Sequence, residues 1–425
     1  MDDLKIFIGG QWRRGGGNPM QSHFPADGSI NATLNAASLD DLEEAVAAGE
    51  RAWRDPAWRN SLPHMRAKIL HNVADLIESR VDALAQMQSR DNGKPLAEAR
   101  GLVMSAAGTA RYFAAACELL EGELPTPRQP DLLTLSCYEP LGVVAAITPW
   151  NSPIASEMQK VAPAIAAGNA VILKPAEATP LMALELGGKS PTIVLEDADI
   201  EQAARGICYG IFSSAGQACI AGSRLFIHES IYAPLMARLL ELTRGLRVGH
   251  PFTDGVHVGP LINEKHRQSV IQYVELAKRE GGRVLCGGEI PADPALVNGS
   301  FFLPTIIEGL SNSARACQEE IFGPVLVAMP FGDEATLIHE ANDSVYGLAA
   351  GIWTRDTGRA LRLSEQLEAG TVWINTYKVF AISTPFGGFK ESGLGREKGI
   401  QGLKAWMQQK SIYLATGNSV NHWCD

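Results

Sequence analysis

The chain has 425 residues, of which 46% are hydrophobic and 20% are charged, so its composition is that of a globular protein with two or three domains. It carries 37 basic and 47 acidic residues, which gives a formal net charge of −10 at pH 7. Because no net basic field is available to attract phosphates or anionic lipids, we exclude nucleic acid and membrane surfaces as main partners.

The cysteine pattern and the first residues bear on the compartment. The start "MDDLKIFIGGQW" has acids where a signal peptide needs bases, and no apolar run approaches the roughly 18 residues of a membrane span. Seven cysteines are scattered without paired spacing, which argues for a reducing compartment and against disulfides or a structural zinc site: Cys117, Cys137, Cys208, Cys219, Cys286, Cys317 and Cys424. We expect a soluble, cytoplasmic protein without a bound metal.

The first third of the chain has helical periodicity. Ser38 is a candidate N-cap with acids in the turn that follows it, and apolar residues then recur at three- and four-residue spacing up to a stop at Asn92 and Gly93. The pattern predicts an α-helical layer from Leu39 to Glu121.

Strands alternate with helices after the Pro-rich stretch "LPTPRQPDL". A strand, helix, strand order between residues 132 and 174 predicts an α/β layer with a parallel sheet. The alternation resumes at Ala198 and continues to the last third of the chain, so we predict a second α/β unit over residues 188–396.

The connection between two strand-like runs is unusually short. "AVIL" (Ala170 to Leu173) and "TIVL" (Thr192 to Leu195) are continuous apolar runs that predict buried strands. If they were parallel neighbours, the crossover between them would need a dozen or more residues with a full helix. Thr179 as N-cap, Pro180 as first helical residue and Gly187 as C-terminal stop leave about two turns of helix.

Three residues are candidates for catalysis, each with a plainer alternative. Cys219, in "FSSAGQACIAGSR", lies among small residues that permit close approach of a substrate, but a buried small hydrophobe fits as well. Glu185, in "LELGGKSP", is a general base in apolar surroundings or a solvated helix end. Asn151, between two prolines in "ITPWNSP", is an oxyanion donor or a turn residue.

Two further segments carry weaker signals. "QEEIFGPV" places Glu319, Glu320 and Phe322 before a Gly-Pro turn. "GLGREKG" is glycine-rich but follows "PFGGFKES" rather than a strand, so we interpret it as a loop and not as a dinucleotide fingerprint.

In this order the segments resemble the aldehyde dehydrogenase superfamily. The resemblance rests on "FIGGQW", "PLGVVAAITPWNSP", "GNAVILKPAEATP", "LELGGKSP", "GQACIAGSR", "EEIFGPV", "GLAAGIWT", "TVWINT" and "PFGGFKESGLGREKG", which together span nearly the full length. It implies an α/β fold with a Rossmann-type cofactor domain, an α/β catalytic domain and a small β oligomerisation arm.

The resemblance also implies roles for residues. Cys219 would be the nucleophile, Glu185 the general base, and Asn151 with the Cys219 backbone N–H the oxyanion hole. Cofactor-binding positions would be Ile147, Thr148, Pro149, Trp150, Lys174, Glu177, Glu320 and Phe322. The implied cofactor is NAD, because Glu177 would repel a 2′-phosphate, with NADP as the alternative. The resemblance implies a small or medium aldehyde as substrate, with Tyr377, Phe380 and residues 381–384 as candidate pocket residues.

The chain departs from the family pattern between the Lys-Pro strand and "LELGGKSP". Roughly seventy residues that complete the dinucleotide-binding half of the doubly wound layout are missing after about residue 183. We therefore expect a truncated cofactor-binding domain over 1–121 and 139–187, a catalytic domain over 188–396, and oligomerisation segments at 122–138 and 397–425 of a homodimer or homotetramer.

Three hypotheses follow from this departure. The first is a working NAD(P)-dependent aldehyde dehydrogenase that oxidises an aldehyde through a thiohemiacetal and a thioester on Cys219. The second is a cofactor-independent thiol esterase that uses Cys219, Glu185 and Asn151. The third is a non-catalytic subunit that assembles with full-length relatives through residues 132–138 and 411–415.

Overall fold

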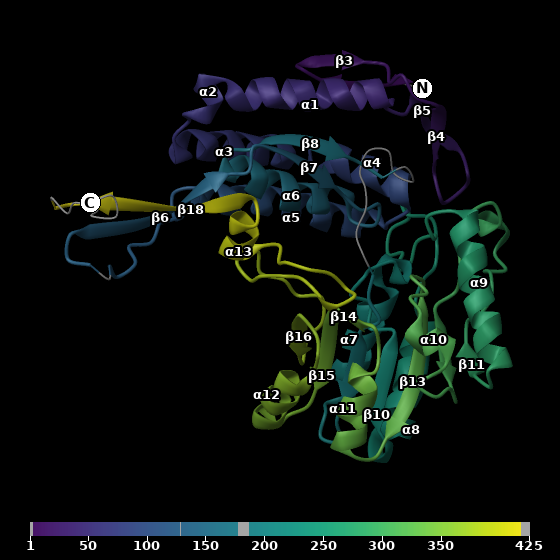
Figure 1. Ribbon diagram of the computed structural model, residues 1–425. Coiled ribbons are helices and arrows are strands. Elements are labelled where there is room, and N and C mark those ends of the chain that lie inside the picture. The colour runs from purple at the N-terminus through teal and green to yellow at the C-terminus, as the bar shows by residue number, and fades with distance from the viewer. Residues whose placement is uncertain (1–2, 128, 177–186, 418–425) are drawn as a thin grey trace.

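The structure is a computed structural model that describes residues 3–127, 129–176 and 187–417. Its first half builds a helical layer from α1 (Leu39–Arg54), α2 (Pro56–Arg59), α3 (Pro63–Glu78), α4 (Val81–Asn92) and α5 (Leu96–Ala116). As predicted, Ser38 caps α1 in a capping box, and α4 stops at Gly93, whose φ of 76° is left-handed. These helices lie at the top of Figure 1.

Short strands precede the helical layer. They are β1 (Asp3–Leu4), β2 (Ile6–Ile8), β3 (Gln11–Arg13), β4 (Pro19–His23) and β5 (Ile30–Asn35). β2 and β3 form a hairpin, and β5 lies between β1 and β4 in a three-stranded sheet. The Arg13 side chain ties β3 to α1 by ion pairs with Asp41 and Glu44.

The predicted strand, helix, strand unit is present. β7 (Val143–Ile147) and β8 (Ala170–Lys174) form a parallel pair joined by α6 (Pro153–Ala167), which packs on α5. Within the described residues this sheet has two strands, and its apolar residues Ile147 and Leu173 are 46% and 39% exposed. Doubly wound dinucleotide-binding domains have six strands, so this sheet is far from complete.

The second α/β unit is built on a seven-stranded sheet. Its order is β11 (Arg283–Cys286), β12 (Thr305–Glu308), β13 (Val325–Phe331), β10 (Arg224–His228), β9 (Pro191–Val194), β15 (Ala349–Trp353) and β16 (Thr371–Ile374). All pairs are parallel except β11 with β12. Around it lie α7 (Ile200–Phe212), α8 (Tyr232–Arg244), α9 (Glu264–Arg279), α10 (Arg315–Gln318), α11 (Glu334–Asn342) and α12 (Thr357–Gln366).

The two strands on either side of the short connection are not neighbours. β8 belongs to the two-stranded sheet and β9 to the middle of the seven-stranded sheet, so the segment between them joins two sheets instead of crossing over within one. The two strands are therefore not parallel neighbours, and no crossover within one sheet joins them. The helix that we predicted from Thr179 lies outside the described residues.

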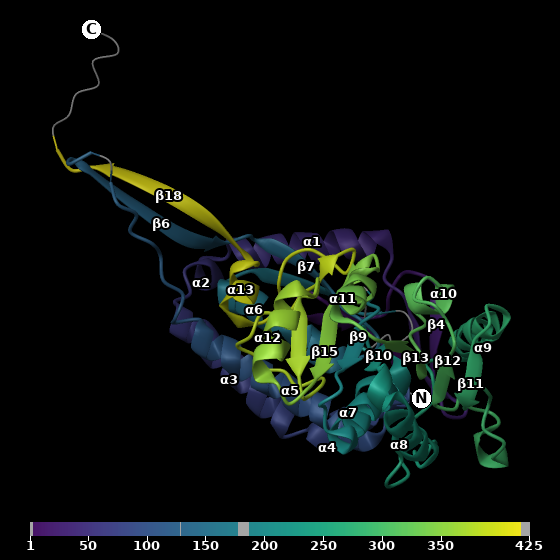
Figure 2. The same cartoon turned by 90° about the horizontal axis from the view of Figure 1, so that it is seen from below.

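A long β-arm extends from the body. β6 (Leu132–Pro140) pairs antiparallel with β18 (Met407–Ala415) along its whole length, and Figure 2 shows the pair reaching far beyond the helices. β14 (Tyr346–Gly347) pairs with β17 (Phe389–Lys390), and α13 (Gly399–Lys404) leads into β18. Three single helical turns complete the elements, at Ser213–Gly216, Glu229–Ile231 and Pro294–Leu296. None of the helices in the described ranges is long and apolar enough to cross a membrane.

A buried arginine ties the second unit together. Arg224, at the start of β10, is 1% exposed and makes four hydrogen bonds. Its acceptors are the carbonyl oxygens of Lys189, Glu340 and Ala341 and the Oδ1 of Asn312. Burial lowers the pKa of the guanidinium to about 10, so it stays charged at neutral pH. These bonds link the start of β10 to the segment before β9, to Asn312 and to the end of α11.

We predict that Arg224→Met lowers the free energy of unfolding by about 3 kcal/mol, because it leaves several buried carbonyls without a donor. Urea unfolding followed by circular dichroism measures this. Arg283→Met is the matched control: Arg283 pairs with Glu308 but its side chain is 74% exposed, so its loss should cost no more than about 1 kcal/mol. Equal losses for the two variants would contradict the assignment.

Candidate active site

The segment that carries Cys219 leaves α7 through a strained turn. Ser214, Ala215 and Gly216 have φ angles of 58°, 53° and 72°, a run of left-handed residues that reverses the chain. Gly216 is required by space as well, because a Cβ there would lie 2.1 Å from the carbonyl oxygen of Gly323. The turn delivers Cys219 to a buried position with 9% exposure, between α7 and β10.

Gln217 fixes the chain just before Cys219. Its Oε1 accepts from the Ile262 backbone N–H at 2.8 Å, and its Nε2 donates to the Ser214 carbonyl at 3.2 Å. The Gln217 carbonyl in turn accepts from Nδ2 of Asn151 at 3.1 Å. Both the side chain and the backbone of Gln217 are therefore bonded, which holds the chain before Cys219 against two neighbouring segments.

Asn151 lies where the sequence placed it, directly before α6. Its side chain is 6% exposed, and the backbone carbonyl accepts from Nδ2 of Asn92 at 3.4 Å. An amide nitrogen has two N–H groups, and one of them is committed to Gln217. The other N–H has no partner among the described residues, as an oxyanion donor requires.

A buried ion pair supports the strained turn from outside. Lys94 is 4% exposed, and its Nζ lies 3.1 Å from Glu98 Oε1 and 2.5 Å from Ser214 Oγ. Glu98 also accepts from the backbone N–H and the hydroxyl of Ser214. Burial acts to raise the pKa of Glu98, but Lys94 and Ser214 outweigh it, and the net shift is downward. The carboxylate is therefore ionised at neutral pH and holds Ser214 in place.

Glu320 meets the turn that follows the short connection. Its Oε1 accepts from the Gly188 backbone N–H at 2.9 Å, and a Cβ on Gly187 would lie 2.1 Å from its Oε2. Burial raises the pKa of Glu320, against the opposing effects of the Gly188 bond and of Lys189. The Gly-Gly sequence is thus what lets this carboxylate come so close.

Two of the predicted cofactor residues form an aromatic group. The ring centroids of Trp150 and Phe322 are 5.3 Å apart, and His266 contacts both at 6.2 Å. Nε2 of His266 donates to the Phe322 carbonyl at 2.7 Å, and burial lowers the pKa of the imidazole. Phe322 has a φ of 54°, so the histidine bond helps to hold an unfavourable backbone.

The other predicted cofactor residues are not gathered in this way. Thr148 and Pro149 are buried next to Trp150, but Ile147 is exposed. Lys174 is also exposed, and its ammonium donates to the adjacent Pro175 carbonyl. Glu177 and the predicted base Glu185 lie outside the described residues.

Sequence reasoning missed several residues of this site. Gln217, two residues before the cysteine, and Lys94, after the helix stop at Gly93, were not among the candidates. The available signals were the order Gly-Gln shortly before the cysteine and a lysine directly after the Asn-Gly stop. Lys160 pairs with Glu397 at 2.5 Å and so fixes α6 against the C-terminal loop, a contact that no local pattern reveals.

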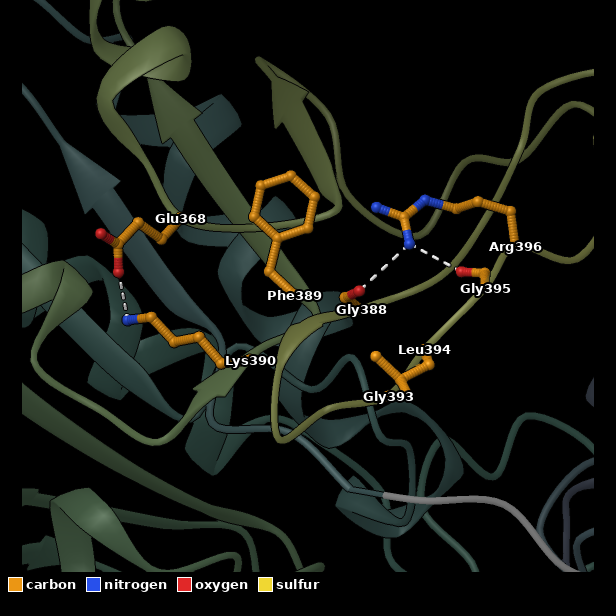
Figure 3. A pocket seen from close by; sticks show the side chains of 8 residues that line it. All are labelled: Glu368, Gly388, Phe389, Lys390, Gly393, Leu394, Gly395 and Arg396. Carbon is orange, nitrogen blue, oxygen red and sulfur yellow. Dashed lines mark hydrogen bonds and ion pairs between the residues drawn. The ribbon is translucent and has the colours of Figure 1, made fainter.

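A surface hollow lies elsewhere in the described structure. Figure 3 shows it in the "PFGGFKESGLGREKG" loop, where the Arg396 guanidinium donates to the carbonyls of Gly388 and Gly395, and Lys390 pairs with Glu368. It is open to solvent, and its lining includes neither Cys219 nor Asn151. The prediction of a loop here is confirmed. No group of three or more His, Cys, Asp or Glu side chains in the described ranges is placed to hold a metal.

Comparisons with known proteins agree with this geometry. The model of the aldehyde dehydrogenase family matches residues 12–185 and 181–412. The chain is 35% identical to a phenylacetaldehyde dehydrogenase of Pseudomonas fluorescens, with 97% of this chain and 96% of that enzyme covered. It is 36% identical to a betaine aldehyde dehydrogenase of Mesorhizobium japonicum, with 95% of each covered.

Solved structures give the same result. A betaine aldehyde dehydrogenase of Staphylococcus aureus, crystallised with NAD+, superposes with a TM-score of 0.96 at 31% identity, covering 99% of this chain and 96% of the other. The chain therefore belongs to the aldehyde dehydrogenase family, a family of enzymes, and the predicted fold class is confirmed. The activity that family and relatives support is aldehyde oxidation.

The same comparisons bear on the missing segment. The family model matches in two pieces that meet at residues 181–185. The alignment with the Pseudomonas enzyme runs over 483 residues, whereas this chain has 425, so at least 58 aligned positions (483 minus 425) have no counterpart here. Both facts fit a deletion inside the cofactor-binding half.

We predict that Asn151→Ala lowers the rate of acylation of Cys219 by about 100-fold, since it removes one oxyanion donor. Burst release of 4-nitrophenol from 4-nitrophenyl acetate measures this step. The melting temperature and the rate of Cys219 alkylation by iodoacetamide serve as controls for folding and access. A burst of unchanged rate would contradict the role of Asn151.

Proposed function

We propose that this protein oxidises an aldehyde to the carboxylic acid, with Cys219 as covalent nucleophile and NAD+ as hydride acceptor. The observation that carries the proposal is the hydrogen bond from Asn151 to Gln217, which brings an amide donor to the segment of a buried cysteine. Relatives that act on phenylacetaldehyde and betaine aldehyde support an aldehyde as substrate.

The chain's own residues supply these steps. Sγ of Cys219, as the thiolate, forms a bond to the aldehyde carbon, and the carbonyl electron pair moves to oxygen. The resulting oxyanion accepts from Nδ2 of Asn151 and from the Cys219 backbone N–H. After hydride loss the acyl group remains on sulfur as a thioester. Glu185 takes a proton from water, which attacks the thioester and releases the acid and the thiolate.

NAD+, when bound, supplies the acceptor for the hydride of the thiohemiacetal carbon. Trp150, Phe322 and Glu320 fit a role at its nicotinamide end, because they are gathered and largely buried. The adenosine end fits less well: Lys174 stands exposed beside a sheet of two strands. We therefore propose that NAD+ is the cofactor and that this chain holds it weakly, with NADP disfavoured if Glu177 faces the ribose.

A second candidate is hydrolysis of esters or thioesters without a cofactor. It is favoured by the two-stranded β7–β8 sheet, since acyl transfer needs the nucleophile and the oxyanion donor but not the dinucleotide half. A non-catalytic subunit that assembles with full-length relatives is the third hypothesis, and the NADH and ester assays below separate all three.

We also propose how the chain is organised. Residues 1–121 and 139–187 form the cofactor-binding domain, 188–396 the catalytic domain, and 122–138 with 397–425 the oligomerisation segments. The exposed apolar residues Ile412, Tyr413 and Leu414 on the β-arm support a homodimer or homotetramer built through it. The scattered cysteines support a cytoplasmic location.

We predict that NAD+ binds with a dissociation constant on the order of 1 mM or weaker, which corresponds to about 4 kcal/mol of binding free energy. The reason is that Lys174 is exposed at the end of β8, in a sheet that has two strands within the described ranges. Isothermal titration calorimetry measures the constant directly. A micromolar value would mean that the shortened half still forms an adenosine site.

We predict that NADH appears at 340 nm when the protein is mixed with an aldehyde and several millimolar NAD+, a level on the order of the expected dissociation constant. Cys219→Ala should abolish this signal because it removes the nucleophile. Ester hydrolysis without NADH would select the second candidate. If folded protein shows neither NADH formation nor ester hydrolysis, the assembly hypothesis remains.

A further inference from the structure

A cluster of charged side chains adjoins the nucleophile segment and is not used by the proposed chemistry. Lys378 donates to Ser213 Oγ at 2.8 Å, and its ammonium lies 5.9 Å from the centre of the Tyr209 ring. Ser213 in turn donates to the Tyr209 carbonyl at 2.6 Å. Lys378 thus contacts the turn that leads from α7 to Cys219.

The neighbouring residue contacts the other side of that segment. The hydroxyl of Tyr377 donates to the carbonyl of Ile220 at 3.1 Å, and its ring packs in one cluster with Cys219 and Phe386. The Lys378 side chain therefore bonds to the chain before Cys219, at Ser213, and the Tyr377 side chain bonds to it after Cys219, at Ile220. Burial raises the pKa of the Tyr377 hydroxyl and lowers that of the Lys378 ammonium, and a charge on Cys219 is a smaller influence that acts upward on both.

The charges of the cluster do not cancel. It holds two ammonium groups, on Lys94 and Lys378, and one carboxylate, on Glu98. The carboxylate is committed to Lys94 and to the backbone and hydroxyl of Ser214. Lys378 has a hydroxyl and an aromatic ring as partners and forms no ion pair with any carboxylate in the described ranges. Burial lowers the pKa of this ammonium to about 8, so it is mostly charged at pH 7.

Exposed apolar side chains adjoin the cluster. Tyr209, Val379 and Phe380 are 56%, 63% and 42% exposed. The ammonium of Lys398 lies 3.7 Å from the centre of the Phe380 ring and 5.2 Å from that of Phe386. The ammonium groups of Lys378 and Lys398 therefore lie beside the apolar rings of Tyr209 and Phe380.

We propose that Lys378 selects substrates in which the aldehyde carries a carboxylate at its far end, and that it disfavours aldehydes with a quaternary ammonium group. The nearby carboxylate, Glu98, is bonded to Lys94 and Ser214, so the half-buried Lys378 ammonium can gain a charge-assisted hydrogen bond from such a substrate carboxylate. A cation at the same place would be repelled. This specificity rests on the proposed function, in which Cys219 attacks the aldehyde carbon.

The first test uses alkylation of Cys219, which needs neither NAD+ nor turnover. Iodoacetate and iodoacetamide have similar size, and the ratio of their rates cancels the thiolate fraction of Cys219. Mass spectrometry follows both reactions. We expect the ratio of the iodoacetate rate to the iodoacetamide rate to be about tenfold higher for Cys219 than for glutathione. It should fall to the glutathione value in Lys378→Met, survive in Lys378→Arg, and be unchanged in the surface control Lys278→Met. A ratio equal in wild type and Lys378→Met overturns the proposal.

The ratio of the two alkylation rates should also depend on pH. It should fall as pH rises through about 8, because Lys378 loses its charge, and stay flat in Lys378→Met. The other titratable groups facing Lys378 are Lys94, Glu98, Tyr209 and Cys219. A wild-type ratio that is constant from pH 6.5 to pH 9.5, a range of about three units centred on 8, would count against Lys378 as the source.

The second test uses turnover of succinic semialdehyde, butanal and betaine aldehyde at saturating NAD+. Lys378→Met should raise KM for the semialdehyde about tenfold with little change in kcat, and leave butanal unaffected. Equal KM changes for all three aldehydes would overturn the assignment. Absence of NADH from every aldehyde would contradict the proposed function, while the alkylation ratio would still decide the role of Lys378.

Discussion

The hydrogen bond between Asn151 and the Gln217 carbonyl is the contact on which the site depends. It joins the loop before α6, in the helical half of the chain, to the segment of Cys219, in the half built on the seven-stranded sheet. The Lys94 and Glu98 pair crosses the same boundary to reach Ser214. The active site therefore lies between the two halves, and its geometry depends on how firmly they are packed.

The segment of Cys219 is held by residues outside the strands β7 and β8. Its contacts come from α4, α5, the loop before α6 and the strained turn after α7. Within the described ranges β8 pairs with β7 alone, so this sheet offers little surface for the far end of a dinucleotide. In the proposed function, acylation of Cys219 and binding of NAD+ therefore depend on different parts of the chain.

The charged residues near Ser213 and Ser214 come from both halves of the chain. Lys94 comes from the helical half, while Tyr209 and Lys378 come from the half built on the seven-stranded sheet, and they meet around Ser213 and Ser214. The relatives include enzymes named for betaine aldehyde, a cation. If Lys378 acts as proposed, the positive cluster sets this chain apart from those relatives in substrate choice.

The sequence by itself determined the elements, the family and the identity of the nucleophile candidate. Capping at Ser38, the stop at Gly93 and the apolar strands from Val143 to Lys174 are local properties, because each depends on neighbouring residues along the chain. The short connection, compared with the family pattern, also predicted that part of the cofactor half is absent. Only the tertiary structure decided that β8 and β9 lie in different sheets, that Gln217 anchors Asn151, and that Lys378 has no carboxylate partner in the described ranges. These are contacts between residues far apart in sequence, and no periodicity or motif encodes which distant side chains a folded chain brings together.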